Sequence, residues 1–135
     1  MQRFVEAQDP IYERVLTELH RGRKTTHWMW FVFPQIEGLG HSAMAQRFSI
    51  HSLDEARAYL AHPVLGPRLL ECVRLLSKVT DRSIDEILGS PDDMKFKSSM
   101  TLFARASADP EVFEQALENF FEGVPDLETL KRIAG

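Results

Sequence analysis

The chain has 135 residues, of which 44% are hydrophobic and 27% charged, and its formal net charge is −4. This length and composition are typical of one compact globular domain and unlike a disordered chain. An acidic chain lacks the electrostatic attraction that drives general binding to nucleic acids or anionic membranes, so we expect neither as a partner.

The cysteine, histidine and hydropathy patterns also argue against disulfides, metal sites and membrane-spanning segments. Cys72 is the single cysteine, which excludes an internal disulfide and a cysteine-rich zinc site. The five histidines show no metal-ligand spacing, so we expect no metal and no cofactor. The longest apolar run, residues 28–34, is far shorter than the roughly 20 residues that span a bilayer, and we expect no signal peptide before it. We therefore expect a cytoplasmic protein.

Helix starts are indicated at six places. A small polar residue precedes proline three times, a pattern typical of an N-cap followed by the first helical residue, in Asp9-Pro10, Ser90-Pro91 and Asp109-Pro110. Ser52 with Glu55 and Ser83 with Glu86 have the spacing of a capping box. Asp126 precedes a further apolar run and supplies the sixth predicted cap.

Apolar residues behind these starts recur with the period of an amphipathic helix. No segment alternates strictly, and the best strand candidate, residues 29–33, has no evident pairing partner. The sequence therefore predicts an all-α single domain, residues 1–135, with about seven to nine short helices around one aromatic-rich core. The predicted helices cover residues 10–20, 26–33, 42–48, 53–61, 63–80, 84–88, 91–106, 110–122 and 127–134.

Residues 24–35 hold both tryptophans and two of the nine phenylalanines. Rings of this size dominate whatever surface they join, so the segment forms either the centre of the core or the wall of a pocket. The same segment opens a series of motifs that runs through most of the chain: residues 27–35, Gly38-Leu39-Gly40 with Ser42, Asp54-Glu55-Ala56, Tyr59-Leu60, His62-Pro63, Leu65-Gly66, Arg68-Leu69, Asp93, Lys95, Ser98, Ser99 and residues 101–103. In these motifs the chain resembles domain of unknown function family 1810, small proteins of bacteria and some eukaryotes. The resemblance implies a mainly helical single domain and carries no settled activity.

A first candidate site combines the aromatic segment with the predicted helix 91–106. On that helix Asp92, Lys95 and Ser99 fall at i, i+3 and i+7, with Ser98 beside them, so they share one stripe. Next to the aromatic rings, this stripe would complete an apolar slot with a few polar groups, as in small-molecule pockets. In the alternative interpretation, which is the commoner one for such residues, the rings belong to the core and the lysine is solvated.

A second candidate is the loop from Gly38 to Ser42. Glycine lets a ligand approach the backbone, and a serine-capped helix N-terminus favours an anion such as phosphate. A plain turn between two helices is the more frequent explanation of a two-glycine loop.

Three functional hypotheses follow. The leading one is a small-molecule site for a nucleotide or ribosyl compound, lined by Trp28, Trp30, Gln35, Gly38, Gly40, Ser42, Lys95, Ser98 and Ser99. Its enzymatic version adds hydrolysis of a glycosidic or phosphate-ester bond, with His27, Asp92 or Asp93 transferring the proton. The alternative is a non-catalytic interaction module, a monomer or a homodimer, in which an apolar face around Phe120 and Phe121 meets a partner.

Overall fold

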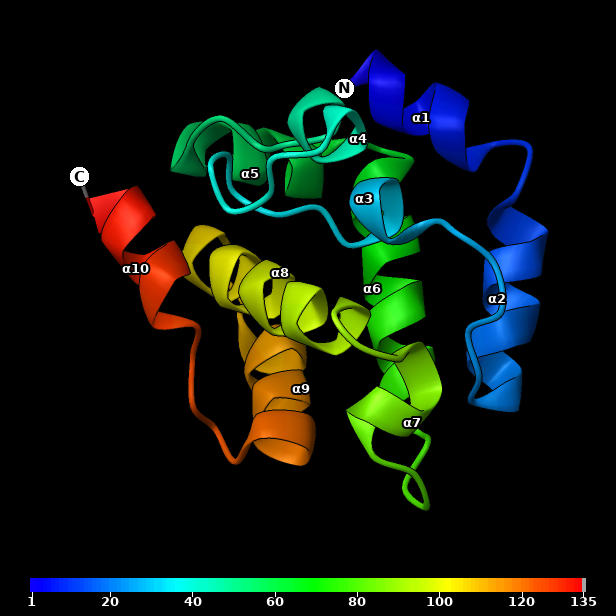
Figure 1. Ribbon diagram of the computed structural model, residues 1–135. Coiled ribbons are helices and arrows are strands. Elements are labelled where there is room, and N and C mark those ends of the chain that lie inside the picture. Colours follow the sequence, from blue (N-terminus) through cyan, green and yellow to red (C-terminus); the bar gives the residue numbers. More distant parts are fainter. Residues whose placement is uncertain (135) are drawn as a thin grey trace.

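The computed structural model describes residues 1–134 and folds them into ten helices (Figure 1). The all-α prediction is confirmed, and the helix count is one above the predicted range. Within the described residues the extended pairing is limited to one isolated bridge between Ile36 and Ile50. The helices are α1 (Gln2–Gln8), α2 (Tyr12–Arg21), α3 (Met29–Val32), α4 (Ala43–Arg47), α5 (Leu53–Ala61), α6 (Leu65–Ser77), α7 (Ile84–Leu88), α8 (Asp92–Ala106), α9 (Glu111–Phe121) and α10 (Leu127–Ala134).

Helix α8 is the centre of the molecule. It packs against α3, α5, α7, α9 and α10, and Figure 1 shows it running across the middle with α10 at one end. Because neighbours enclose it, α8 buries polar residues as well as apolar ones, including Ser98, Ser99 and Thr101. In the stripe that the sequence assigned to a pocket, Ser98 and Ser99 are therefore buried against other helices.

Helices α5 and α6 approach each other at a glycine. A Cβ atom added to Gly66 would lie 2.1 Å from the carbonyl oxygen of Leu60, which is far inside van der Waals contact. Glycine is normally unfavourable inside a helix. Here its missing side chain allows two backbones to touch, which places α5 and α6 side by side.

Three of the predicted caps are confirmed. Ser83 and Glu86 form the complete capping box, with reciprocal distances of 3.1 and 2.9 Å. The hydroxyl of Ser52 accepts from the Glu55 amide at 3.1 Å, and the Asp126 carboxylate accepts from the Thr129 amide at 3.0 Å.

The three caps predicted before proline are wrong. Asp9 ends α1, and α2 begins after Ile11. At α8 and α9 the prolines themselves, Pro91 and Pro110, occupy the cap position, and neither helix start has a side-chain cap. The carbonyl of Pro91 accepts the first helical bond, from the Lys95 amide at 3.1 Å, so the preceding residue is one position too far upstream to cap the helix.

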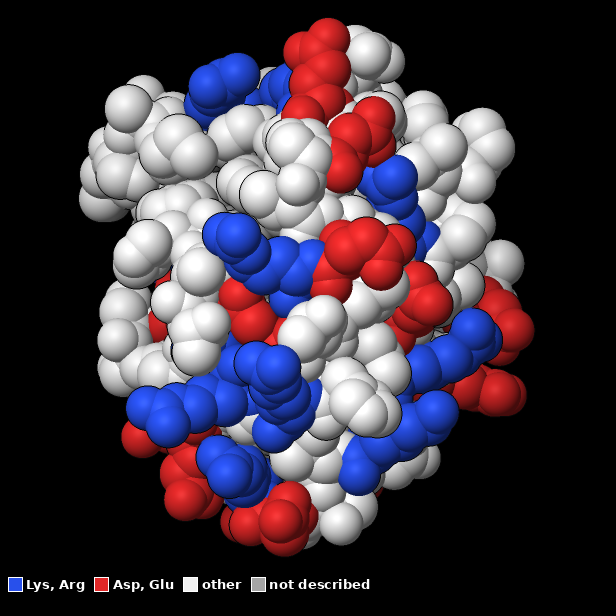
Figure 2. Space-filling view, turned by 90° about the vertical axis from the view of Figure 1, so that its right-hand side faces the viewer, with Lys and Arg blue, Asp and Glu red and all other residues white. Residues whose placement is uncertain are grey.

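Charges are mixed on the face that bears α1 and α2. Figure 2 shows Lys and Arg side chains interspersed with Asp and Glu there, with no broad region of one sign. None of the helices over residues 1–134 is long and apolar enough to cross a membrane.

Candidate functional site

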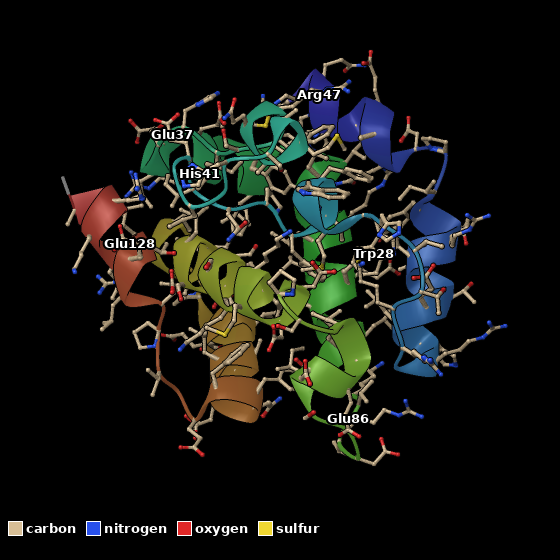
Figure 3. The ribbon with its side chains drawn as sticks, viewed as in Figure 1. Trp28, Glu37, His41, Arg47, Glu86 and Glu128 are labelled. Atoms are coloured by element: carbon tan, nitrogen blue, oxygen red, sulfur yellow. The ribbon has the colours of Figure 1, made fainter. Side chains whose placement is uncertain are left out.

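The two tryptophans of the aromatic segment have different environments. Trp28 is 1% exposed, lies 6.0 Å from the Phe33 ring, and its indole Nε1 donates a 3.0 Å hydrogen bond to Glu18. Trp30 is only partly buried. The expectation that Trp28 lines a pocket is therefore corrected, because its ring is enclosed in the core. Figure 3 labels Trp28 on the segment that joins α2 to α3.

Glu18 is the buried partner of that segment. Its carboxylate accepts from the backbone amides of Thr25 and Thr26, at 2.7 and 3.0 Å, from the Thr26 hydroxyl and from Trp28. Burial by itself would raise the pKa of Glu18, but these hydrogen bonds outweigh it and lower the pKa to about 2. An ionised carboxylate therefore holds residues 25–28 against α2.

Trp30 lines a cleft of about 390 Å³ together with Gln35, Gly38 and Gly40. These are four of the nine residues predicted to bind a ligand, and they come together because the chain turns back after α3 toward α10. Figure 3 labels Glu37 and His41 on this turn, and Glu128 on α10. The remaining lining residues are Ile36, Glu37, His41, Ala45, Gln46, Phe48, Ser49, His51 and Arg132.

Gly38 provides space for an arginine from the other end of the chain. Its φ is +93°, and a Cβ atom added to it would lie 2.2 Å from Nη1 of Arg132 on α10. Any larger residue would push the guanidinium out of the cleft. The glycine was predicted to let an anion reach the backbone, whereas in the structure it lets a cation lie against the backbone.

Ser42 has a local structural role. Its hydroxyl accepts from the Ala45 amide at 3.1 Å and caps α4, a helix of only five residues. The side chain is exposed and lies outside the lining of the cleft. The predicted serine cap is therefore confirmed, and the side chain of Ser42 does not take part in the lining of the cleft.

Lys95 and Asp92 lie beside Trp30 but outside the cleft. The ammonium group of Lys95 is 5.4 Å from the centroid of the Trp30 ring and 3.7 Å from the Asp92 carboxylate. Lys24, whose side chain is 7% exposed, binds the same carboxylate at 2.9 Å. Asp92 is therefore held between two cations and is poorly placed to transfer a proton to a ligand.

The other predicted site residues are separated from the cleft. Ser98 donates to the Met94 carbonyl and to Asp126, and so links α8 to α10. Ser99 is fully buried, and its hydroxyl has no partner within residues 1–134. Asp93 accepts from the Met94 amide, and His27 is exposed in the loop before Trp28. Their expected roles in this site are therefore corrected.

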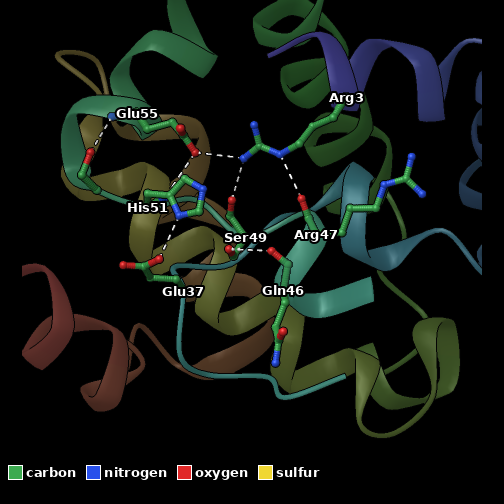
Figure 4. A network of polar contacts seen from close by, with 8 residues as sticks. Arg3, Glu37, Gln46, Arg47, Ser49, His51 and Glu55 are labelled. Atoms are coloured by element: carbon green, nitrogen blue, oxygen red, sulfur yellow. Dashed lines mark hydrogen bonds and ion pairs between the residues drawn. The ribbon is translucent and has the colours of Figure 1, made fainter. Parts of the chain in front are cut away.

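The cleft contains a histidine and carboxylate pair that the sequence did not reveal. Nδ1 of His51 lies 2.8 Å from the carboxylate of Glu37, and both side chains are 56% exposed. The backbone amide of His51 also donates to Glu55 at 3.2 Å. The imidazole is therefore anchored at its backbone and at one ring nitrogen (Figure 4).

Arg3 of α1 supports the wall of the cleft from behind. Its guanidinium donates to the carbonyls of Arg47 and Ser49, at 3.0 and 2.8 Å, and binds the Glu55 carboxylate at 3.1 Å (Figure 4). These contacts join the end of α4 to the start of α5. They keep the two sides of the turn that carries His51 in a fixed arrangement.

A family model described as "Protein of unknown function (DUF1810)" matches residues 1–133. The chain belongs to the DUF1810 family. This confirms the resemblance stated from the sequence motifs. The DUF1810 chain is also similar to the crystal structure of the conserved hypothetical protein Rv1873 from Mycobacterium tuberculosis, with 53% identity and a TM-score of 0.98. The match covers 99% of this chain and 96% of the other. None of the curated proteins compared with it matches.

In this DUF1810 protein, the residues of one wall of the cleft were predicted from the sequence, and those of the opposite wall were not. His41 lies in the glycine loop and His51 follows it, eleven residues after Gly40, so a cluster of polar residues around that loop was a usable signal. Arg132 gave no such signal, because only the packing of α10 against α8 brings it to Gly38.

Proposed function

We propose that this DUF1810 protein binds a small anionic ligand that carries an aromatic ring, such as a nucleotide or ribosyl phosphate, in the cleft beside Trp30. The observation that carries the proposal is the close approach of Gly38 and Arg132, which places a guanidinium along a cleft with an accessible aromatic wall. A volume of about 390 Å³ lies in the range of small-molecule sites.

The aromatic side of the cleft suits a planar ring. The half-buried Trp30 offers a stacking surface, and stacked aromatic pairs gain energy beyond that of simple burial. Gln35 and Gln46 also line the cleft, and their amide groups both donate and accept hydrogen bonds. These groups match the mixed donors and acceptors on the edge of a nucleobase.

The cationic side suits a phosphate. Arg132 uses Nε for its pair with Glu128, at 3.6 Å, and its two terminal amino groups donate to no other group among residues 1–134. A guanidinium with free terminal groups binds phosphate oxygens in a bidentate manner.

Binding is tested with adenosine monophosphate, with adenosine and inorganic phosphate as partial ligands. We expect the nucleotide to raise the melting temperature of the wild-type protein by several degrees at about 100 times its dissociation constant. Arg132→Gln should weaken its binding by about tenfold to a hundredfold without changing the melting temperature of the free protein, because charged hydrogen bonds contribute about 1.5–3 kcal/mol each. Calorimetric titration measures the affinity, and thermal unfolding of the free variant measures its melting temperature.

Lys131→Gln is the matched control, since Lys131 is exposed on the same helix, carries the same charge and does not line the cleft. Equal affinity in the Arg132 and Lys131 variants would remove the cleft as the binding site. Absence of binding to the wild-type protein would remove adenosine monophosphate as its ligand.

The interaction module is less well supported. Phe120 and Phe121 are half-buried, and their rings lie 6.2 and 6.3 Å from the ring of Phe96 in the core. Little of their apolar surface is left for a partner.

A further inference from the structure

A second cavity lies directly beside the first. It also has a volume of about 390 Å³, and it is lined by Ile36, Glu37, His51, Ser52, Leu53, Arg132 and Ile133. Four of these residues line the first cavity too, namely Ile36, Glu37, His51 and Arg132. They form the boundary between the two cavities, which we call the saddle. A ligand longer than a mononucleotide would cross the saddle to fill both.

The saddle contains the groups needed to hold and activate a reacting centre. Arg132 presents its unpaired terminal amino groups there, and His51 presents its ring. Because the Glu37 carboxylate can only accept, Nδ1 of His51 carries the shared hydrogen. Nε2 of the neutral ring then has a free lone pair, and it has no hydrogen-bond partner among residues 1–134.

We infer that the substrate is a phosphodiester whose two halves occupy the two cavities, with its phosphate at the saddle, and that His51 is the general base that hydrolyses it. This inference rests on the proposed function, because it places the aromatic half beside Trp30 and the phosphate on Arg132. It replaces His27, Asp92 and Asp93 as proton-transfer groups with a residue that lines both cavities.

The reaction needs only water as a second reactant. Nε2 of His51 takes a proton from a water molecule while the water oxygen forms a bond to phosphorus. The bond from phosphorus to the leaving oxygen breaks, and the leaving oxygen keeps the electron pair. The imidazolium of His51 then returns the proton to that oxygen, so the products are a phosphomonoester and an alcohol.

Glu37 has a positioning role in this scheme. It fixes the tautomer of His51 and stabilises the imidazolium that forms when the proton is taken up. Arg132 stabilises the charge that develops on the phosphate oxygens, and Glu128 orients the guanidinium through Nε.

The test uses the 4-nitrophenyl ester of thymidine 5′-monophosphate, which has a nucleoside half and a small aromatic half joined by one phosphate. We expect the wild-type protein to release 4-nitrophenolate in proportion to protein concentration. His51→Gln should lower kcat by about a hundredfold or more, as for loss of a general base. His20→Gln, at an exposed histidine on α2 outside both cavities, should retain the full rate.

Glu37→Gln separates a positioning role from a merely structural one. We expect it to lower kcat while KM stays unchanged, and its melting temperature should equal that of the wild type because the side chain is exposed. It also serves as the second variant if His51→Gln fails to fold.

Three outcomes decide between the two proposals. The hydrolytic inference is overturned if the wild-type protein releases no 4-nitrophenolate, or if His51→Gln and Glu37→Gln both release it at the wild-type rate. If adenosine monophosphate still binds to the same preparation, the proposed binding function stands without it. Release that depends on His51, from a protein that does not bind adenosine monophosphate, supports the inference and overturns only that choice of ligand.

Discussion

Trp28→Ala should lower the free energy of unfolding by about 3–5 kcal/mol, while Trp30→Ala should lower it by roughly 1–2 kcal/mol. Both residues are tryptophans, and they lie two positions apart in the sequence. Trp28 is 1% exposed and donates to Glu18, so its removal leaves a cavity and takes one donor away from that buried carboxylate. Trp30 is already in partial contact with solvent and loses less by truncation.

Urea unfolding of both variants, followed by circular dichroism, measures the difference. The two variants should also differ in their affinity for adenosine monophosphate. The Trp30→Ala protein should remain folded and bind the nucleotide more weakly, because it lacks the proposed stacking surface. Equal destabilisation at the two positions would contradict the assignment of one ring to the core and the other to the cleft.

Glu18→Ala should destabilise the protein by about 3 kcal/mol or more. The substitution leaves the amides of Thr25 and Thr26 and the indole of Trp28 without their acceptor, and an unsatisfied buried donor costs about 1–3 kcal/mol. Glu13→Ala is the control, because Glu13 is an exposed glutamate on the same helix. Chemical unfolding at neutral pH compares the two variants.

The Glu18 network also predicts a dependence of stability on pH. The pKa of Glu18 falls from its ordinary value of 4.5 to about 2 on folding. A lowered pKa means that the stabilisation by the ionised carboxylate is complete above about pH 4.5 and is lost as the pH falls toward 2. The difference in the free energy of unfolding between the wild-type protein and Glu18→Ala should therefore become smaller as the pH falls across that interval. A difference that stays constant down to pH 2 would show that the carboxylate is not held in its charged form.

The fold was largely predictable because most of its helices carry local signals. The Ser83 capping box and the Asp126 cap lie within four residues of the amides that they bind, so spacing alone identified them. Helix α1 has no side-chain cap at Met1, and it was missed for that reason. Its stability comes from burial of Phe4 and Gln8 against later parts of the chain, and no local pattern reports such contacts.

The cleft was only half predictable. Trp30, Gln35, Gly38 and Gly40 are close in sequence, and their composition pointed to a site. The serines of α8 shared a helical stripe with Lys95, but a stripe does not reveal which face other helices cover. Since α8 is enclosed by neighbours, Ser99 became part of the interior.

The contact between Gly38 and Arg132 has a consequence for the history of the family. The two positions occupy one volume, so a side chain can be gained at the first only when the guanidinium leaves the second. Substitutions at these positions should therefore have been accepted together in DUF1810 proteins. A lineage that has replaced the glycine should also have lost the arginine, and with it the guanidinium that lines this cleft.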